Sequence, residues 1–351
     1  MNLLVTGGAG FVGSNLIRHV IDQAEAQTVV NLDCLTYAGH PENLESVSRH
    51  PKYRFELVDL RDEPALLGVI RKHRITHVMH LAAESHVDRS IAGPGDFIHS
   101  NVVGTFNLLE ACRSAWEGNY RGKRFHHVST DEVYGSLGPV GRFTEASPYA
   151  PNSPYAASKA ASDMFVRAYH HTYGFPAVIT NSSNNYGPYQ FPEKLIPVVI
   201  QSALQRRPIP VYGDGLQVRD WLHVGDHADA LWLVLLRGRE GETYCIGGDS
   251  EWTNLQIAER VCDLVDELAP HLGGNSRRLI RCVADRPGHD RRYAIEASKI
   301  RRELGWQPAH EFDSGLRETV AWYLSHQDWV RIVTSSTGRC RLGSASPPPP
   351  S

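Results

Sequence analysis

The residues best suited to acid–base chemistry stand near the middle of the chain. Thr130, Asp131 and Glu132 follow one another, and Tyr155 and Lys159 come after a loop rich in Gly, Pro and Ser. Neighbouring carboxyl groups tend to separate their pKa values, so that one can donate a proton while the other accepts one. A phenol near an ammonium group can serve as a base, because the positive charge stabilises the phenolate. This group of residues therefore predicts a site that moves protons.

Tyr155 and Lys159 share one face of a predicted helix. Pro151 and Pro154 precede a helical pattern that begins near Tyr155 and runs past Phe165, and residues four apart in a helix lie on one face. Lowering the pKa of a phenol from about 10 to about 7 takes about 4 kcal/mol in favour of the phenolate, which the ammonium group and a positively charged cofactor ring can share. The same spacing also occurs on ordinary helix surfaces, so the pair gains meaning only beside a cofactor motif.

The N-terminus supplies such a motif. The apolar strand Leu3–Val5 leads into a turn in which Gly8, Gly10 and Gly13 fit G-x-G-x-x-G, and an amphipathic helix follows. Glycines in this setting let the backbone approach a pyrophosphate at the helix N-terminus. A second apolar run ends in Asp33, twenty residues after Gly13, where a carboxylate would bind a ribose hydroxyl and repel a 2′-phosphate. The motif predicts NAD rather than NADP, with a plain tight turn as the alternative.

The first half of the chain alternates predicted strands and helices. The predicted strands are 3–5, 29–32, 55–58, 77–81, 125–129 and 177–180, and the helices between them include 65–71, 102–111 and one from 155 onward. This alternation predicts an α/β fold, a Rossmann-type doubly wound parallel sheet, whose ligands bind at the carboxyl ends of the strands. The residues at such ends are Asp33, Asp59, Ala82, Ser129 and Asn184.

The pattern changes from about Tyr186, where prolines divide the sequence into short segments. The prolines are Pro188, Pro192, Pro197, Pro208 and Pro210. Short strands are predicted at 211–212 and 244–246, and helices at 231–236, 255–268 and 316–324. We therefore expect residues 1–185 to form an NAD-binding Rossmann domain and residues 186–330 to form mainly a smaller mixed α/β substrate-binding domain, with room for the chain to cross back. Residues 335–351, rich in Ser, Gly and Pro, predict a flexible tail.

The overall composition excludes several classes of function. A chain of 351 residues with 41% hydrophobic content can bury a large core. The net charge of -3 gives no broad basic field, so we expect no nucleic-acid partner, and no apolar run has the length of a membrane span. Glycines interrupt any signal-type segment at the start, and six cysteines stand without C-x-x-C spacing, which predicts a reducing cytoplasm. The eighteen histidines form no H-E-x-x-H pattern, and we predict no metal site.

Longer stretches of the sequence resemble a known family. They are Leu81–Asp88, Ser129–Gly135, Ser183–Tyr189, Phe191–Pro197, Val218–Trp221 and Asp285–Asp290. Together with the glycine motif and the Tyr155/Lys159 pair, they resemble the extended short-chain dehydrogenase/reductase family and, within it, the nucleotide-sugar 4,6-dehydratases, in particular those that act on dTDP-glucose. The resemblance extends to about Trp329. The joint match is highly specific, although each stretch alone is not.

The resemblance implies a reaction and a role for each central residue. Such an enzyme oxidises C4 of the hexose by hydride transfer to tightly bound NAD, eliminates water across C5 and C6, and returns the hydride to C6, giving dTDP-4-keto-6-deoxy-glucose. By resemblance, Tyr155 removes the proton of the C4 hydroxyl with Lys159 beside it. Asp131 is then the acid, Glu132 the base and Thr130 a hydrogen-bond partner of the C4 oxygen. Each acid or base would contribute about 10²–10⁴-fold to the rate.

The resemblance also implies binding residues for both ligands. Besides Tyr155 and Lys159, the expected NAD-binding residues are Gly7, Gly10, Phe11, Val12, Gly13, Asp33, Leu35, Thr36, Asp59, Leu60, Leu81, Ala82, Ala83, Ser85, Ser100 and Asn185. The expected substrate-binding residues are Ser85, Thr130, Asn184, Lys194, Leu195, Pro210, Tyr212, Arg219, Asn254, Arg286 and His289. A homodimer is also implied, through the predicted helix 102–111 and residues 156–169 of the next helix.

Two departures from the family pattern leave the choice of sugar nucleotide open. Ser100 stands where Thr is usual, and Asn181-Ser182 stands where Arg-Cys is usual. Three alternatives remain. The first is a 4,6-dehydratase of another nucleotide sugar, such as UDP-glucose. The second is a UDP-sugar 4-epimerase or decarboxylase, against which the Asp131-Glu132 pair argues. The third is a non-catalytic NAD-binding scaffold, against which the presence of all five central residues argues.

Overall fold

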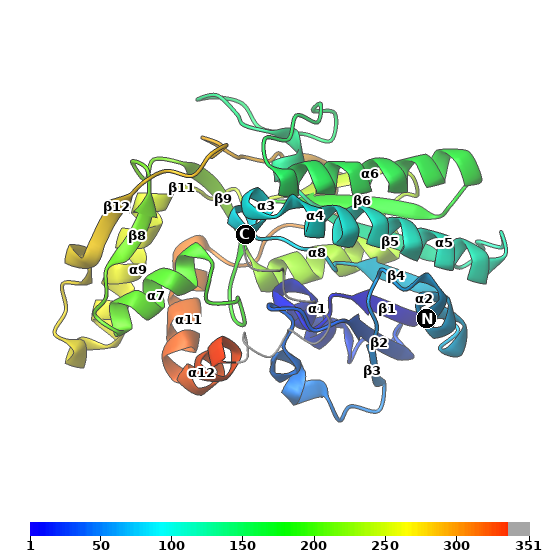
Figure 1. The fold of residues 1–351 in the computed structure, drawn as a ribbon, viewed down its shortest axis with the longest axis horizontal. Coiled ribbons are helices and arrows are strands. Elements are labelled where there is room, and N and C mark those ends of the chain that lie inside the picture. The colour runs from blue at the N-terminus through cyan, green and yellow to red at the C-terminus, as the bar shows by residue number, and fades with distance from the viewer. Residues whose placement is uncertain (336–351) are drawn as a thin grey trace, which may run out of the picture.

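The computed structural model of the protein describes residues 1–335 and has a seven-stranded sheet at its centre (Figure 1). In order across the sheet, the strands are β10 (Thr243–Ile246), β6 (Ala177–Ser182), β5 (Arg124–Thr130), β4 (His77–His80), β1 (Asn2–Thr6), β2 (Thr28–Asp33) and β3 (Tyr53–Leu57). Every neighbouring pair is parallel. The predicted Rossmann-type fold is therefore confirmed. The tail predicted for residues 335–351 lies, from residue 336 onward, outside the described part of the chain.

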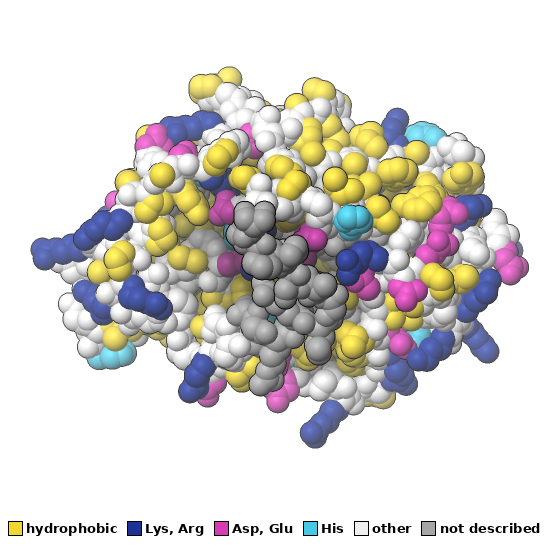
Figure 2. All heavy atoms as spheres, viewed as in Figure 1, with side chains coloured by type: hydrophobic (Ala, Val, Ile, Leu, Met, Phe, Trp, Pro, Cys, Tyr) yellow, Lys and Arg dark blue, Asp and Glu magenta, His cyan; other side chains and the backbone are white. Residues whose placement is uncertain are grey.

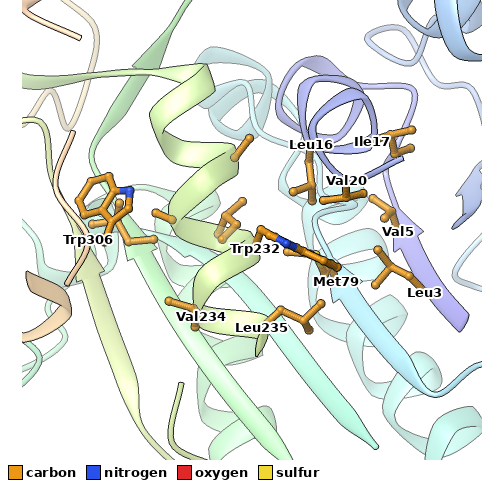
Figure 3. Packing of buried hydrophobic residues seen from close by; sticks show 14 of the residues in the cluster. Leu3, Val5, Leu16, Ile17, Val20, Met79, Trp232, Val234, Leu235 and Trp306 are labelled. Carbon is orange, nitrogen blue, oxygen red and sulfur yellow. The ribbon is translucent and has the colours of Figure 1, made fainter. Parts of the chain in front are cut away.

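Helices cover both faces of this sheet. Those on one face are α1 (Phe11–Val20) and α8 (Val224–Arg237), and those on the other are α2 (Glu63–Lys72), α5 (Gly104–Trp116) and α6 (Pro154–Tyr173). In β1, Leu3 and Val5 face the first layer and Leu4 faces the second, because side chains alternate along a strand. Figure 3 shows Leu16 of α1 and Trp232 of α8 meeting above these strands. The alternating apolar pattern thus builds two separate cores.

The chain leaves the large sheet after β6 and later returns to it. The helix α8 packs on α1, and β10 extends the sheet beside β6. Ala297, Ile300 and Trp306 join the same core. A parallel strand can be added only through a long crossover, and here the crossover between β6 and β10 carries residues 184–223 of the smaller part of the molecule before α8. Residues from both halves of the sequence therefore build the large sheet and its cover.

The smaller part of the molecule lies at the left of Figure 1 and has its own hydrophobic core. Its strands form one sheet in the order β11 (Glu251–Thr253), β9 (Val218–His223) and β7 (Asn184–Tyr186), and a two-stranded sheet of β12 (Ile280–Val283) and β8 (Ile209–Tyr212). Its helices are α7 (Leu195–Leu204), α9 (Asn254–Leu268), α11 (Phe312–Ser325) and α12 (Gln327–Ser335). The shorter helices α3 (Val87–Ala92), α4 (Pro94–Phe97) and α10 (Ser298–Leu304) complete the fold.

Two prolines do not interrupt structure in the way the sequence predicts. Pro197 is the third residue of α7, where a missing N–H costs nothing because the first-turn N–H groups have no partner within the helix. Pro210 lies in β8, with its side chain exposed.

The predicted helix 102–111 begins at Gly104, after a π-helical turn at Ile98–Val103, and continues to Trp116. Among residues 1–335, no helix is long and apolar enough to span a membrane.

Candidate active site

A cleft of about 350 Å³ opens at the carboxyl ends of the central strands, within the range of about 300–1,000 Å³ that is typical of small-molecule sites. The predicted cofactor residues that line it are Gly7, Gly10, Phe11, Val12, Gly13, Asp33, Thr36, Asp59, Leu60, Leu81, Ala82, Ala83, Ser85, Ser100, Tyr155, Lys159 and Asn185. Leu35 is not among the lining residues; its N–H instead donates to Asp33 Oδ1 at 2.8 Å. The cleft is also lined by Thr130, Asp131, Glu132, Asn184 and Lys194. One cavity therefore holds the predicted catalytic and cofactor residues together.

The glycine loop forms a narrow cradle at the N-terminus of α1. Gly7 has a φ of 69°, and a Cβ there would lie 2.7 Å from the backbone of Ala82. A Cβ at Gly13 would lie 2.2 Å from the Gly7 carbonyl oxygen. Gly8 does not line the cleft, and a Cβ there would meet the Asn31 side chain at 2.3 Å. The first glycine of the motif that lines the cleft is therefore Gly7. Gly8 is required instead by its packing against the Asn31 side chain.

Asp33 fastens this loop from the end of β2. Its Oδ2 accepts a hydrogen bond from the Ala9 N–H at 2.9 Å, and its Oδ1 accepts the bond from Leu35. Burial raises the pKa of Asp33, and these backbone hydrogen bonds act in the opposite direction. Each carboxylate oxygen can accept a further hydrogen bond. A cradle without side chains, a helix N-terminus and a carboxylate at the neighbouring strand end fit a dinucleotide.

The end of β5 presents the hydroxyl and the first carboxyl group to the cleft. Thr130 Oγ1 accepts a bond from the Glu132 N–H at 3.3 Å and donates to Asp131 Oδ1 at 3.4 Å. Asp131 is only 1% exposed, and its Oδ2 has no hydrogen-bond partner within the described part of the chain. Burial raises the pKa of Asp131 well above its usual range, and the charges of Glu132 and Asp220 raise it further. These effects all favour the protonated form of Asp131.

Glu132 is placed among cations. Burial raises the pKa of its carboxyl group, while the positive charges of Arg286, Arg219 and Lys194 lower it. The pair therefore has unequal environments, because the neighbours that act most strongly on Asp131 after burial are carboxylates. The proton resides more readily on Asp131, and Glu132 more readily gives an ionised acceptor.

Tyr155 and Lys159 lie on the buried side of α6. The helix is capped by Ser153, whose Oγ accepts a bond from the Ala156 N–H at 3.1 Å. Lys159 Nζ donates to the Val128 carbonyl oxygen at 2.9 Å, and burial lowers the pKa of Lys159 to about 8. Burial and the charge of Glu132 raise the pKa of the Tyr155 phenol. In the protein without cofactor, the ammonium of Lys159 therefore does not lower the pKa of the Tyr155 phenol to about 7 as predicted. A further positive charge is needed to stabilise the phenolate.

The remaining predicted substrate residues are not among the residues that line the cleft, and two of them, Arg286 and Tyr212, contact Asp88 of α3. Arg286 Nη1 lies 3.5 Å from Asp88 Oδ1, and the Tyr212 hydroxyl donates to Asp88 Oδ2 at 3.1 Å. The ring of His289 lies 6.4 Å from that of Tyr212. Arg286 Nε is buried and has no hydrogen-bond partner among residues 1–335. Leu195 and Asn254 begin α7 and α9, and Pro210 and Arg219 lie in β8 and β9.

Several lining residues were not predicted from the sequence, among them Glu84, Gln190, Phe191, Glu193 and His227. The Phe191 ring stacks on that of His40 at 5.4 Å and meets the edge of Tyr37 at 6.0 Å. The Arg89 guanidinium lies 3.5 Å from the centre of the Tyr37 ring. Contacts between loops so far apart in the chain leave no spacing pattern. For these residues, the only available signal was the position of Glu84, Phe191 and Glu193 inside family-like stretches.

Comparison with known proteins places this site in a family. Residues 4–319 match the family model described as GDP-mannose 4,6 dehydratase. The dTDP-glucose 4,6-dehydratase of Neisseria meningitidis serogroup B is 55% identical over 351 residues, covering 97% of this chain and 99% of that protein. DesIV, a dTDP-glucose 4,6-dehydratase from Streptomyces venezuelae solved with NAD and TYD bound, superimposes with a TM-score of 0.88 at 46% identity, covering 95% of this chain and all of that one.

A solved epimerase has the same fold at a lower identity. The UDP-glucose 4-epimerase of Thermus thermophilus, in complex with NAD, superimposes with a TM-score of 0.82 at 32% identity, covering 93% of this chain and 100% of that one. The fold is thus shared by dehydratases and epimerases, while the sequence lies nearer the dehydratases. The chain therefore belongs to the family described as GDP-mannose 4,6 dehydratase and, within it, to the dTDP-glucose 4,6-dehydratases.

Proposed function

We propose that this protein converts dTDP-glucose into dTDP-4-keto-6-deoxy-glucose, with NAD bound in the cleft and unchanged after each turnover. The observation that carries the proposal is the Asp131–Glu132 pair, which shares one cleft with Thr130, Tyr155 and the glycine cradle. Oxidation at C4, or epimerisation, requires the tyrosine and the cofactor. Elimination of water requires an acid and a base in addition. The unequal environments of the two carboxyl groups suit these two tasks.

The chain's own residues would hold the cofactor at the carboxyl end of the sheet. Gly7 and Gly13 line the cleft at the N-terminus of α1, where the pyrophosphate would bind, and the Asp33 carboxylate would accept a hydrogen bond from a ribose hydroxyl. A carboxylate there disfavours a 2′-phosphate, which selects NAD over NADP. When bound there, NAD would supply the hydride acceptor for oxidation at C4 of the hexose and, once reduced, the hydride donor for C6.

The proton transfers are assigned by the resemblance to the family, and the shared cleft supports the assignment. Tyr155 accepts the proton of the C4 hydroxyl, with the Thr130 hydroxyl hydrogen-bonded to the C4 oxygen and the ammonium of Lys159 supporting the phenolate. The C4 ketone acidifies the C5 hydrogen, which Glu132 removes as a proton. Asp131 protonates the C6 hydroxyl, the C6–O bond breaks and water leaves, with a double bond formed between C5 and C6. After hydride return to C6, C5 takes up a proton, so the product carries one hydrogen from solvent.

The cations around Glu132 suit the diphosphate of a nucleotide sugar. Arg286 offers an Nε without a partner within the described residues, and arginine forks match phosphate oxygens. Arg219 is 5% exposed and is held by the Asp290 carbonyl oxygen at 3.0 Å and by the Tyr293 ring, whose centre lies 4.3 Å away. These contacts fix Arg219 before any ligand arrives. The dTDP-glucose 4,6-dehydratases at 46–55% identity support dTDP-glucose as the sugar nucleotide.

Mass spectrometry in heavy water tests the proposal. The purified protein is incubated separately with dTDP-glucose, UDP-glucose and GDP-mannose. We expect loss of one water from dTDP-glucose alone, with one deuterium gained and no net NADH. Water loss from another sugar nucleotide would overturn the specificity and keep the mechanism. Epimerised or decarboxylated product, or no reaction while NAD remains bound, would overturn the dehydratase proposal.

We also propose a homodimer formed through α5 and α6. Phe106, Met164 and Phe165 are 39–47% exposed on these helices, and the two phenylalanine rings lie 6.3 Å apart. Figure 2 shows hydrophobic side chains gathered over this region, which a second copy would cover. Light scattering should give twice the chain mass for the native protein and the single mass for Phe106→Glu/Phe165→Glu. A native monomer would refute the dimer.

The unpaired thiols of Cys34, Cys112, Cys245, Cys262 and Cys282 favour a cytoplasmic location.

A further inference from the structure

One buried carboxyl group beside the cleft has no part in the proton transfers described above. Asp163, in α6, is 0% exposed. Its Oδ2 accepts hydrogen bonds from Ser129 Oγ at 2.9 Å, from the Tyr149 hydroxyl at 2.8 Å and from Asn181 Nδ2 at 3.2 Å. Its Oδ1 lies 3.0 Å from His127 Nε2. An ionised carboxyl group is purely an acceptor, so a site with three hydrogen-bond donors to Oδ2 is built for the carboxylate.

The donors belong to the elements that carry the active site. Ser129 immediately precedes Thr130 in β5, and Asn181 lies in β6, where its Nδ2 also donates to the Thr130 carbonyl oxygen at 3.1 Å. Asp163 follows Lys159 by one helical turn, and both side chains are on the buried face of α6. The carboxylate thus connects three elements: the helix that carries Tyr155, the strand that carries Thr130, and the neighbouring strand.

Lys159 provides the positive charge opposite this carboxylate. Burial and the charge of Lys159 lower the pKa of His127, and burial raises the pKa of Tyr149, so both are neutral at neutral pH. Tyr134 donates to Asn181 Oδ1 at 3.3 Å, and burial raises its pKa too. The His80 ring, 5.2 Å from that of His127, is kept neutral by burial. Burial lowers the pKa of Lys159 to about 8, and Asp163 is the charge that opposes this fall.

We propose that Asp163 is a positioning residue of this active site: its carboxylate keeps Lys159 in the ammonium form and ties α6 to the ends of β5 and β6. The consequence for catalysis rests on the proposed function, because it assumes that Tyr155 and Lys159 serve the C4 oxidation. The charge of Lys159 itself can be measured without any substrate. The role of Asp163 toward Lys159 and the proposed function can therefore be refuted independently of each other.

Nuclear magnetic resonance of labelled lysine tests the electrostatic part. The chain has six lysines, at positions 52, 72, 123, 159, 194 and 299, so the side-chain signals can be resolved, and the one lost in Lys159→Arg is assigned. In Asp163→Asn we expect the titration midpoint of Lys159 to fall by about one unit or more, with the other five unchanged. Tyr149→Phe removes one hydrogen bond to Asp163 but leaves its charge, and should keep the midpoint. An unchanged midpoint in Asp163→Asn, or an equal fall in both variants, would overturn the proposal.

The pH profile of C4 oxidation tests the catalytic part. The rate of NADH formation is measured against pH in a single turnover with dTDP-glucose. We expect the pH dependence of this rate that follows the charge of Lys159 to lie about one pH unit lower in Asp163→Asn than in the native protein. If the midpoint falls from about 8 to about 7, the ammonium fraction at pH 7.5 falls from about three quarters to about one quarter, a threefold loss. KM should stay unchanged, and Asp163→Glu, which keeps the charge, should restore the native profile. A profile that does not move overturns this part. If the native protein forms no NADH from dTDP-glucose, the proposed function fails, while the lysine titration still decides the role of Asp163.

Discussion

Replacing Asp131 by asparagine should stop the loss of water while leaving the C4 oxidation in place. The amide has the shape of the carboxyl group but cannot supply an acidic proton to the C6 hydroxyl. A general acid contributes about 10²–10⁴-fold, so the elimination should slow by that factor, which corresponds to about 3–5 kcal/mol of activation free energy. Thr130, Tyr155 and Lys159 are untouched, and the first step should remain within a few-fold of the native rate.

The structure also fixes the expected effect of Asp131→Asn on stability. The pKa of Asp131 is raised in the folded protein. As the pH rises above the unfolded value of about 3.9, the unfolded chain gains free energy by ionising while the folded one stays protonated, so folding loses about 1.4 kcal/mol per unit of pKa shift. Asparagine ionises in neither state. The variant should therefore melt at the same temperature as the native protein or higher at pH 7, and a lower melting temperature would show that the native carboxyl group is held in its ionised form.

Hydrogen exchange at C5 separates the acid from the base. In heavy water with dTDP-glucose, Asp131→Asn should accumulate the 4-keto sugar and NADH and exchange the C5 hydrogen for deuterium, because Glu132 still removes it. Glu132→Gln should accumulate the same ketone without exchange. NADH absorbance and mass spectrometry of the sugar nucleotide follow both events. Near-normal water loss in Asp131→Asn would refute the acid assignment, and exchange that persists only in Glu132→Gln would show that the two roles are reversed.

Three further substitutions test other parts of the site. Gly13→Ala places a Cβ 2.2 Å from the Gly7 carbonyl oxygen, so the purified variant should lose bound NAD, as measured by the cofactor released on denaturation; a full complement would contradict the cradle. Tyr155→Phe should keep NAD but form no NADH with substrate, and rapid NADH formation would exclude the tyrosine as the base. Arg286→Ala should raise KM for dTDP-glucose about tenfold or more with NAD content unchanged, whereas an unchanged KM would remove Arg286 from the diphosphate site.

The fold could be predicted where the sequence repeats a strong periodicity. Runs such as Leu3–Val5 and Val29–Leu32 are mostly apolar, as buried parallel strands are, and the structure pairs them side by side in the large sheet. The segment around α7 could not be predicted as a helix, because Pro197 resembles a helix breaker unless the first turn is already known to begin at Leu195. The return of β10 to the large sheet depends on packing against β6 and leaves no local signal.

The candidate site divides in the same way. The cradle and the strand-end acids were predictable because backbone geometry dictates glycine and because carboxyl ends of parallel strands meet at one edge. The alignment on Gly8 shows the limit of this reasoning: Gly7 and Gly8 are indistinguishable as letters, and only the contacts of their missing Cβ atoms separate them. Asp163 carried no motif at all. Its importance follows from its contacts with Ser129, Tyr149, Asn181 and His127, none of which belongs to its own helix.

The raised pKa of Tyr155 has a meaning beyond the free protein. Burial and the charge of Glu132 both favour the protonated phenol, which keeps the phenolate scarce until a positive charge arrives with the cofactor. Once Tyr155 has taken the proton of the C4 hydroxyl, the same two causes hold that proton on the phenol and oppose its return to the C4 oxygen. The arrangement thus favours the ketone, the state from which Glu132 can remove the C5 proton. Glu132 is therefore placed to stabilise the product of the first step and to carry out the second, and a lone tyrosine–lysine pair would lack this coupling.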